Sequence, residues 1–267
     1  MRVFWAGWHV WRPRFSVILS GLEEACGDAA AFRAICHCYR EEHSFDASAS
    51  VLQWYLEPSM AATIGGPPRD ALDFRSDIAG LVESSGWIWQ DPFNDCSWEQ
   101  DAINGLIIRA VNGRDLFFLN RSAPRLVRSV NGDFVAETIC APALDDRPSS
   151  GGLLLWKDEE NYLSLNWGRG GRHEICLEGC VGREDMVFGR GRLPAERTFL
   201  RLERRGARVD ALCSADGDTW WSVGHASFLA DDPVQIGLCA IGMIDRTVYP
   251  GAYREGTAIR FETFRLW

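Results

Sequence analysis

Two glutamates and a cysteine alternate along one apolar stretch, Glu174-Ile175-Cys176-Leu177-Glu178. If this stretch is a β-strand, the three polar side chains share one face, because successive side chains of a strand point to opposite faces. Two carboxylates that flank a glycosidic bond can hydrolyse it, one as the acid and the other as base or nucleophile. Four residues at the strand rise place Glu174 and Glu178 about 13 Å apart. Glycosidases hold their carboxylates closer than that, so a glycoside hydrolase is the least favoured alternative.

The histidines and cysteines show no spacing of known catalytic or zinc-binding sites. The chain has five histidines but no His-Glu-x-x-His pair, and it has no Gly-x-Ser-x-Gly elbow. Cys36-His37-Cys38 resembles a ligand cluster, but adjacent helical residues point in different directions and no second cluster has zinc-finger spacing. Free cysteines in apolar runs behave as small hydrophobes. Three of the nine cysteines lie in such runs: Cys140, Cys213 and Cys239.

The elements that would carry such residues are mainly β-strands, and residues 198–223 show this most clearly. Leu200 and Leu202 alternate with Arg201 and Glu203, which predicts a strand with one buried and one solvated face. Turns at Arg205-Gly206 and Asp216-Gly217 then predict two consecutive hairpins, because glycine takes positive φ without steric cost. Residues on the return strand that should face the core are Val209, Ala211 and Cys213. The pattern predicts an antiparallel β-sandwich.

Two Asn-Gly pairs predict further hairpins, since Asn-Gly is a strong hairpin-turn signal. One pair, Asn112-Gly113, divides residues 106–119, and the other, Asn131-Gly132, divides residues 126–140. In each case the flanking residues are rich in Leu, Ile, Val and Phe. We therefore expect each segment to form a β-hairpin.

A third hairpin is expected in residues 153–167, followed by a glycine-rich hairpin tip at 168–172. Its second strand should bury one set of side chains, Leu163, Leu165 and Trp167. The other set, Tyr162, Ser164 and Asn166, should lie on the opposite face. We also expect Ile236 to be buried between the sheets.

The pattern from Ser16 to Gly86 is helical instead. The segment from Asp70 to Ser84 is the clearest helix, with Phe74, Ile78, Leu81 and Val82 on one stripe and Gly86 as its stop. We expect a small helical N-terminal segment at residues 1–85, followed by the sandwich at 86–267. A chain that begins near Ser85 should then fold cooperatively by itself.

The C-terminal two thirds resemble a known superfamily. The order of four motifs is similar to that of the concanavalin A-like jelly rolls. These motifs are Gly-Gly-Leu-Leu-Leu from residue 151, Asn161-Tyr162, Ser214-Ala-Asp-Gly-Asp-Thr-Trp220 and Val234-Gln-Ile-Gly-Leu. The nearest branches are the YesU-like "regulation of enolase" proteins and the C-terminal sandwich module of family 43 glycoside hydrolases. The resemblance implies an antiparallel two-sheet jelly-roll sandwich over about residues 86–267. Proteins with this fold include binding modules, hydrolases and spacers between domains, so the resemblance does not determine a function.

The resemblance also implies where a ligand would bind. A concave sheet face would offer Trp156, Tyr162, Asn166 and Trp221 to a glycan, because aromatic rings stack on sugars and planar amides bond hydroxyls. A structural or protein-interaction module is the alternative, with those aromatics in the core.

Some related modules hold a structural calcium ion at the start of the first strand. Here Asp91, Asn94 and Asp95 are oxygen donors of suitable hardness. A solvated turn is the competing interpretation, because a calcium site needs further ligands that the sequence does not identify. No other cofactor is expected.

Charge and hydropathy narrow the choice of partners. The net charge of −9 disfavours nucleic acid and anionic membrane as partners. The apolar residues 1–15 are interrupted by His9 and Arg12 and are too short to cross a bilayer.

An odd number of cysteines without a secretory leader favours a reduced compartment, so we expect a cytoplasmic protein. We expect a non-catalytic module that binds a glycan or another small ligand, in an oligomeric state that the sequence does not reveal.

Overall fold

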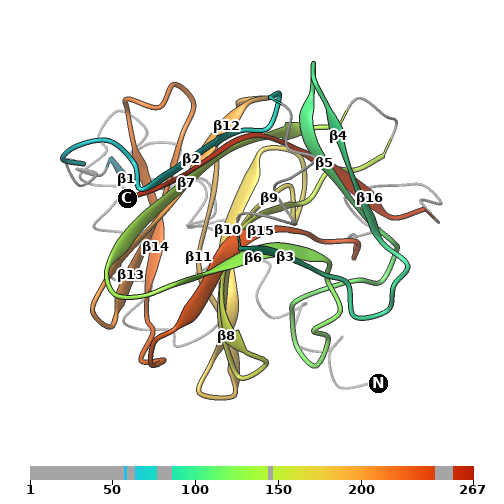
Figure 1. Ribbon diagram of the computed structural model, residues 1–267. Coiled ribbons are helices and arrows are strands. Elements are labelled where there is room, and N and C mark those ends of the chain that lie inside the picture. Colours follow the sequence, from blue (N-terminus) through green and yellow to red (C-terminus); the bar gives the residue numbers. More distant parts are fainter. Residues whose placement is uncertain (1–56, 59–63, 77–85, 144–146, 244–254) are drawn as a thin grey trace, which may run out of the picture. The chain divides into compact units, whose positions relative to one another are not determined.

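In the computed structural model, residues 57–58, 64–76, 86–143, 147–243 and 255–267 are described below. The chain divides into two compact units, 1–53 and 54–267, and the first lies outside the described residues. Most of the helical segment expected before residue 86 also lies outside them. Within the described residues there is no helix at all, and so none that could span a membrane. The second unit is an antiparallel two-sheet jelly-roll sandwich (Figure 1).

The first sheet has nine strands, and its neighbouring strands all pair antiparallel. Its strands in spatial order are β1 (Glu57–Pro58), β14 (Trp221–Ser227), β13 (Arg208–Ser214), β12 (Thr198–Arg205), β7 (Phe134–Pro142), β16 (Thr257–Leu266), β5 (Gly105–Ala110) and β4 (Ser97–Asp101), while β2 (Asp70–Asp73) pairs with one end of β16.

The second sheet has seven strands and is also antiparallel. Its strands in spatial order are β11 (Glu184–Arg192), β10 (Glu174–Val181), β9 (Asn161–Trp167), β8 (Gly151–Asp158), β15 (Val234–Ala240), β6 (Arg125–Val130) and β3 (Trp87–Gln90).

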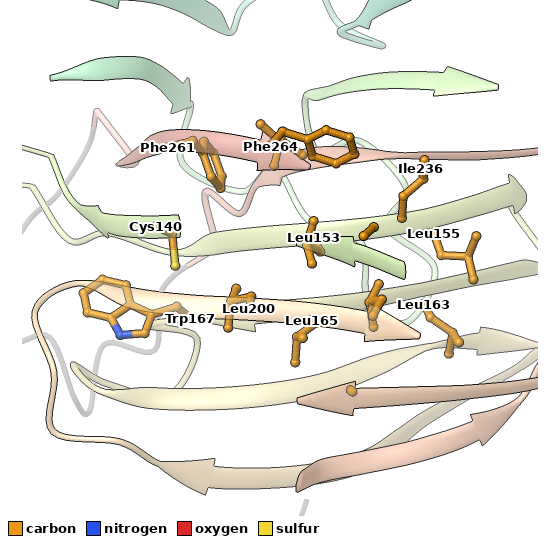
Figure 2. Packing of buried hydrophobic residues seen from close by; sticks show 14 of the residues in the cluster. Cys140, Leu153, Leu155, Leu163, Leu165, Trp167, Leu200, Ile236, Phe261 and Phe264 are labelled. Atoms are coloured by element: carbon orange, nitrogen blue, oxygen red, sulfur yellow. The ribbon is translucent and has the colours of Figure 1, made fainter. Parts of the chain in front are cut away.

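One apolar core fills the space between the two sheets (Figure 2). Alternate residues of each strand supply it, as period-two patterning requires. All five residues predicted to lie there are fully buried: Leu163, Leu165, Leu200, Leu202 and Ile236. Burying a Leu or Ile side chain contributes about 1.5–3 kcal/mol relative to leaving it in water, so this cluster is the main source of stability.

The sheets approach each other closely at one side of the sandwich, where Gly189 of β11 lies against Val223 of β14. A Cβ added to Gly189 would lie 1.9 Å from the carbonyl oxygen of Val223. Only glycine therefore fits this contact, because any side chain would push β11 and β14 apart.

The hairpins at 153–167 and 198–214 are confirmed. Strands β8 and β9 pair across the turn at Glu159-Glu160, and β12 pairs with β13 across Gly206-Ala207, one residue later than the predicted Arg205-Gly206 turn. The hairpin predicted around Asn131-Gly132 is wrong, because β6 belongs to the second sheet and β7 to the first. Gly132 does take a positive φ of 71°. The backbone bends at residues 132–133, but the bend passes the chain from one sheet to the other, which local turn chemistry does not reveal.

The sandwich begins before residue 86, contrary to the predicted boundary. Residues Asp70–Asp73 form strand β2 rather than the start of a helix, and they pair with Thr263–Leu266 of β16. Phe74 follows directly and is fully buried in the core. A four-residue strand is too short to show its own periodicity, so the pairing with β16 decides its conformation.

The outer face of β12 is not solvated as the alternation predicted. Arg201 and Glu203 are only 7% and 5% exposed. Arg201 forms an ion pair of 2.8 Å with Glu137 of β7, and its guanidinium lies 3.7 Å from the ring centroid of Trp220. A charged residue is buried here because an opposite charge and an aromatic ring both contact it.

Candidate functional site

The segment between β5 and β6 lies across the outer face of the second sheet. We call residues 111–124 the crossing loop. The structure contradicts the hairpin predicted around Asn112-Gly113, because residues 116–119 form no strand. Instead Leu116 and Ala123 are fully buried in a second apolar cluster with side chains of β8, β9 and β15. The loop therefore covers the sheet face on which a ligand was expected.

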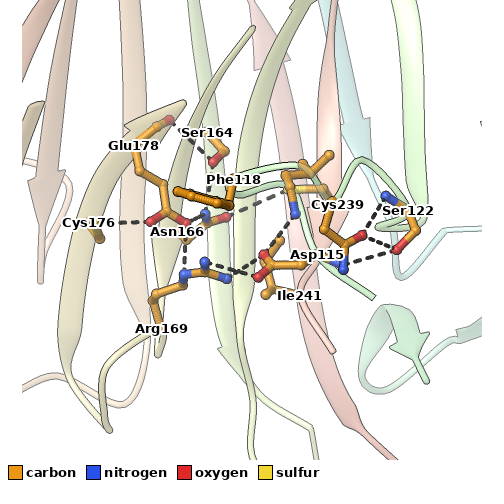
Figure 3. A network of polar contacts seen from close by, with 12 residues as sticks. Asp115, Phe118, Ser122, Ser164, Asn166, Arg169, Cys176, Glu178, Cys239 and Ile241 are labelled. Carbon is orange, nitrogen blue, oxygen red and sulfur yellow. Dashed lines mark hydrogen bonds and ion pairs between the residues drawn. The ribbon is translucent and has the colours of Figure 1, made fainter. Parts of the chain in front are cut away.

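Polar contacts also fix the crossing loop to the sheet. The Tyr162 hydroxyl donates a hydrogen bond to the carbonyl of Leu116. Arg169 donates to both carboxylate oxygens of Asp115, at 2.6 and 3.2 Å, and its Nε lies 2.8 Å from Glu178 Oε1. Figure 3 shows Arg169 between these two carboxylates. Side-chain exposures of 13%, 6% and 1% for Arg169, Asp115 and Glu178 make this a buried ion network.

Burial sets the proton affinities of this network. Desolvation raises the pKa of Glu178 above its ordinary value, although Arg169 opposes the shift. Desolvation opposes the charged form of Arg169, but Glu178 and Asp115 together raise its pKa. Arg169 therefore stays a cation between the two carboxylates, while burial makes Glu178 take up a proton more readily than an exposed glutamate as the pH falls.

The structure brings together three of the four predicted ligand contacts but buries them. Trp156, Tyr162 and Asn166 share the outer face of the second sheet, with exposures of 7%, 0% and 0%. The Trp156 and Tyr162 rings stack 5.2 Å apart, and Asn166 Nδ2 donates to Ser164 Oγ at 3.0 Å. The crossing loop lies over them, so no part of these rings is an open platform.

The fourth predicted contact, Trp221, lies elsewhere. It begins β14 of the first sheet and packs against the core between the sheets. The prediction that all four residues share one concave surface is therefore wrong for Trp221. Every tryptophan within the described ranges is buried or half-buried.

An open depression lies on the solvent side of the crossing loop. Its volume is about 680 Å³. Apolar residues form much of its lining, namely Pro92, Phe93, Phe117, Phe118, Leu119 and Met243. The polar residues of the lining are Asp115, Asn120, Arg121, Ser122 and Glu159. Ligand sites of this size commonly combine apolar walls with a few fixed polar groups.

Phe118 is the most distinctive residue of the depression. Its side chain is 68% exposed and its φ is 59°, a left-handed conformation that non-glycine residues rarely adopt. Arg121 donates a hydrogen bond to the Phe118 carbonyl and so holds the backbone in place. In the described part of the chain, no aromatic ring or guanidinium group stacks on the Phe118 ring.

Sequence reasoning missed these residues because it placed Phe118 in a strand. Phe117, Phe118 and Leu119 are three consecutive large apolar residues. Apolar and polar residues alternate in a half-buried strand. A run of apolar residues without alternation, close to an Asn-Gly pair, was therefore the available signal for an exposed apolar loop.

The residues proposed for calcium lie beside the depression, and the carboxylate oxygens of Asp91 and Asp95 are already engaged. Asp91 accepts the Cys96 amide at 2.7 Å, and Asp95 forms an ion pair with Arg114. The oxygens of Asp91 and Asp95 lie within 4.8 Å of each other and of Cys96 Sγ, but Asn94 is not part of that group. A cation here would have to displace the Arg114 guanidinium, so this donor set fits a structured turn better than a calcium site.

The glutamates on β10 are placed as the spacing predicted. Glu174, Cys176 and Glu178 are buried on the outer face, while Ile175 and Leu177 face the core. The register shift near Glu178 comes from an extra residue in β11, so β10 keeps its regular spacing. The separation of about 13 Å therefore stands, too long for a glycosidase pair.

Strand order and pairing together define the fold class of this protein: its second unit is an antiparallel two-sheet jelly-roll sandwich. No family model and no curated protein matches the chain. Solved structures do match it. A functionally unknown protein from Saccharomyces cerevisiae is similar over 68% of this chain and 96% of its own, with a TM-score of 0.52 and 16% sequence identity.

Two family 43 glycoside hydrolase proteins are also similar in fold. BlXynB from Bacillus licheniformis is similar over 77% of this chain, with a TM-score of 0.56 and 17% identity. GH43B of the Bacteroides ovatus xyloglucan PUL is similar over 78% of this chain, with a TM-score of 0.54 and 16% identity. This chain spans 40% of the length of each of these two proteins. Identities this low establish a shared fold, and the function has to be argued from the site.

Proposed function

We propose that the sandwich is a non-catalytic module that binds an oligosaccharide in the depression beside the crossing loop. The observation that carries this proposal is the exposed ring of Phe118 at a depression that also contains Glu159 and other polar groups. Aromatic rings stack on the apolar faces of sugars, and carboxylates accept hydrogen bonds from their hydroxyl groups.

The backbone conformation of Phe118 supports the proposal. A left-handed non-glycine residue costs on the order of 1–3 kcal/mol, and such residues cluster at ligand sites. The surrounding contacts offset this cost, since Leu116 is fully buried and Arg121 bonds the Phe118 carbonyl. The chain thus holds a large apolar ring in water at an energetic cost, which is expected where the ring contacts a ligand.

A protein-interaction surface is the second candidate. Leu119 is 91% exposed and Phe93 is 59% exposed, and both line the same depression as Phe118. Exposed apolar side chains that gather on one surface are typical of protein contacts. We favour the oligosaccharide because the depression has the volume of a small-ligand site and contains a carboxylate without an ion pair among the described residues.

The test is a binding screen on the full chain with one variant and one control. Oligosaccharide binding is measured by calorimetric titration for the parent protein, Phe118→Ala and Leu229→Ala. Leu229 is 77% exposed and does not line the depression. We expect Phe118→Ala to weaken binding by about 1–3 kcal/mol, as other stacked contacts do, without lowering the melting temperature.

Two outcomes would contradict the proposal. The first is that no oligosaccharide binds to the parent protein. The second is that Phe118→Ala binds as tightly as Leu229→Ala, which would move any glycan site away from the depression.

A further inference from the structure

The charges around the depression determine which class of oligosaccharide it can bind. Three arginines border it: Arg121 lines it directly, Arg114 lies 3.9 Å from the Phe93 ring centroid, and Arg169 lies 5.6 Å from that of Phe117. A free arginine here would be a ready site for a carboxylate, sulfate or phosphate group.

Each of these arginines is already paired with both oxygens of one aspartate. Arg114 bonds Asp95, with its Nε at 3.0 Å from Oδ1 and its Nη2 on Oδ2. Arg169 bonds Asp115 in the same two-pronged way, at 2.6 and 3.2 Å. The bordering guanidinium groups are therefore neutralised within the protein.

Arg121 is saturated as well. Its Nη2 lies 3.0 and 3.2 Å from the two carboxylate oxygens of Asp185. Its Nε donates to the Glu159 carbonyl at 2.9 Å, and its Nη1 donates to the carbonyls of Phe118 and Asn120. The five donors of the guanidinium are thus all used to hold the loop and the β8–β9 turn together.

One carboxylate near the depression has no such partner. Glu159 lines the depression, is exposed, and forms no ion pair with any described residue. Its neighbour Glu160 has a different environment, because it pairs with Arg183 at 2.8 Å. The three bordering arginines are paired, and Arg125, whose charge interacts with Glu159, is only 8% exposed and does not line the depression. Among the described lining residues, Glu159 is therefore the charge that a bound ligand meets without an ion-pair partner.

We infer that the depression is selective for neutral oligosaccharides and that Glu159 is the residue that sets this selectivity. A sugar hydroxyl donates to the Glu159 carboxylate, whereas a uronate or sulfate group meets a like charge and finds no free guanidinium. This inference rests on the proposed binding function.

The experiment titrates the full chain with neutral and acidic oligosaccharides of equal length. The neutral probes are xylotetraose, cellotetraose and mannotetraose, and the acidic probes are tetragalacturonate and a chondroitin sulfate tetrasaccharide. We expect the best neutral probe to bind at least about tenfold more tightly than either acidic probe. Glu159→Gln should weaken neutral binding about fivefold, the difference between a charged and a neutral acceptor, and should reduce the discrimination against tetragalacturonate. Glu160→Gln is the matched control and should behave like the parent protein.

Acidic binding as tight as neutral binding would overturn the selectivity while leaving the binding function in place. Unchanged discrimination in Glu159→Gln would overturn the role of that residue. If none of the five probes binds, both the inference and the proposed function fail.

Discussion

Replacing Arg169 by methionine removes the cation that holds the crossing loop on the sheet. Methionine keeps much of the apolar stem of arginine, so the change removes the charge and its hydrogen bonds rather than the packing. Asp115 and Glu178, with side chains 6% and 1% exposed, would be left as buried carboxylates without this partner. Breaking a buried pair in this way costs about 3–5 kcal/mol of stability.

The matched control is Arg183→Met. Arg183 forms an ion pair with Glu160 at 2.8 Å, the same distance as that between Arg169 and Glu178. Its side chain is 77% exposed, however, and such exposed pairs contribute little to stability because water screens them. The two variants therefore lose contacts of equal length that differ in burial.

Urea unfolding followed by tryptophan fluorescence measures both variants, with the free energy obtained by linear extrapolation. The free energy of unfolding of Arg169→Met should be well below that of Arg183→Met. This loss of stability should be smaller at acidic pH, where Glu178 takes up a proton. Adding Asp115→Asn and Glu178→Gln to Arg169→Met should restore part of the loss, since no charge is then left buried. If Arg169→Met is as stable as Arg183→Met, the ion network does not hold the loop and the reasoning is refuted.

Three further changes test other parts of the structure. Burial raises the pKa of Glu178 above 4.5, so the folded state holds more protons than the unfolded state between that value and the raised pKa. Stability should then fall as the pH rises through this window, and Glu178→Gln should flatten the slope, while an unchanged slope would contradict the shift. Trp156→Ala should lower the free energy of unfolding by about 3–5 kcal/mol, because the ring is only 7% exposed, and a neutral effect in urea unfolding would contradict its burial. A chain that begins at Ser85 loses strand β2 and the fully buried Phe74, so it should melt well below the full chain or be insoluble, and an unchanged melting temperature would mean that β2 is dispensable.

The hairpins and core of the sandwich were predictable because their signals are local. In residues 153–167 and 198–214, alternation and turn residues agree, and the two strands that pair are neighbours in the chain. Strand β2 gave no such signal, since its pairing with β16 joins residues almost two hundred positions apart. The same holds for Arg201, whose burial depends on Glu137 of a different strand.

The candidate site was harder to predict than the fold. Alternation placed Tyr162 and Asn166 on the correct face of β9, but whether that face is open depends on where the crossing loop goes. An Asn-Gly turn forms equally well in a hairpin and in a connection that leaves the sheet, so the sequence around Asn112 does not distinguish them. The exposed ring of Phe118 became visible only once residues 116–119 were seen to form no strand.

The central claim is that the depression beside the crossing loop binds an oligosaccharide, and a crystal structure of the full chain with a bound neutral tetrasaccharide tests it most directly. We expect a sugar ring to stack on Phe118 and a hydroxyl group to lie within hydrogen-bond distance of the Glu159 carboxylate. The buried residues Trp156, Tyr162 and Asn166 should make no contact with the sugar. A sugar bound on another face of the sandwich, or beneath a displaced crossing loop, would contradict the account.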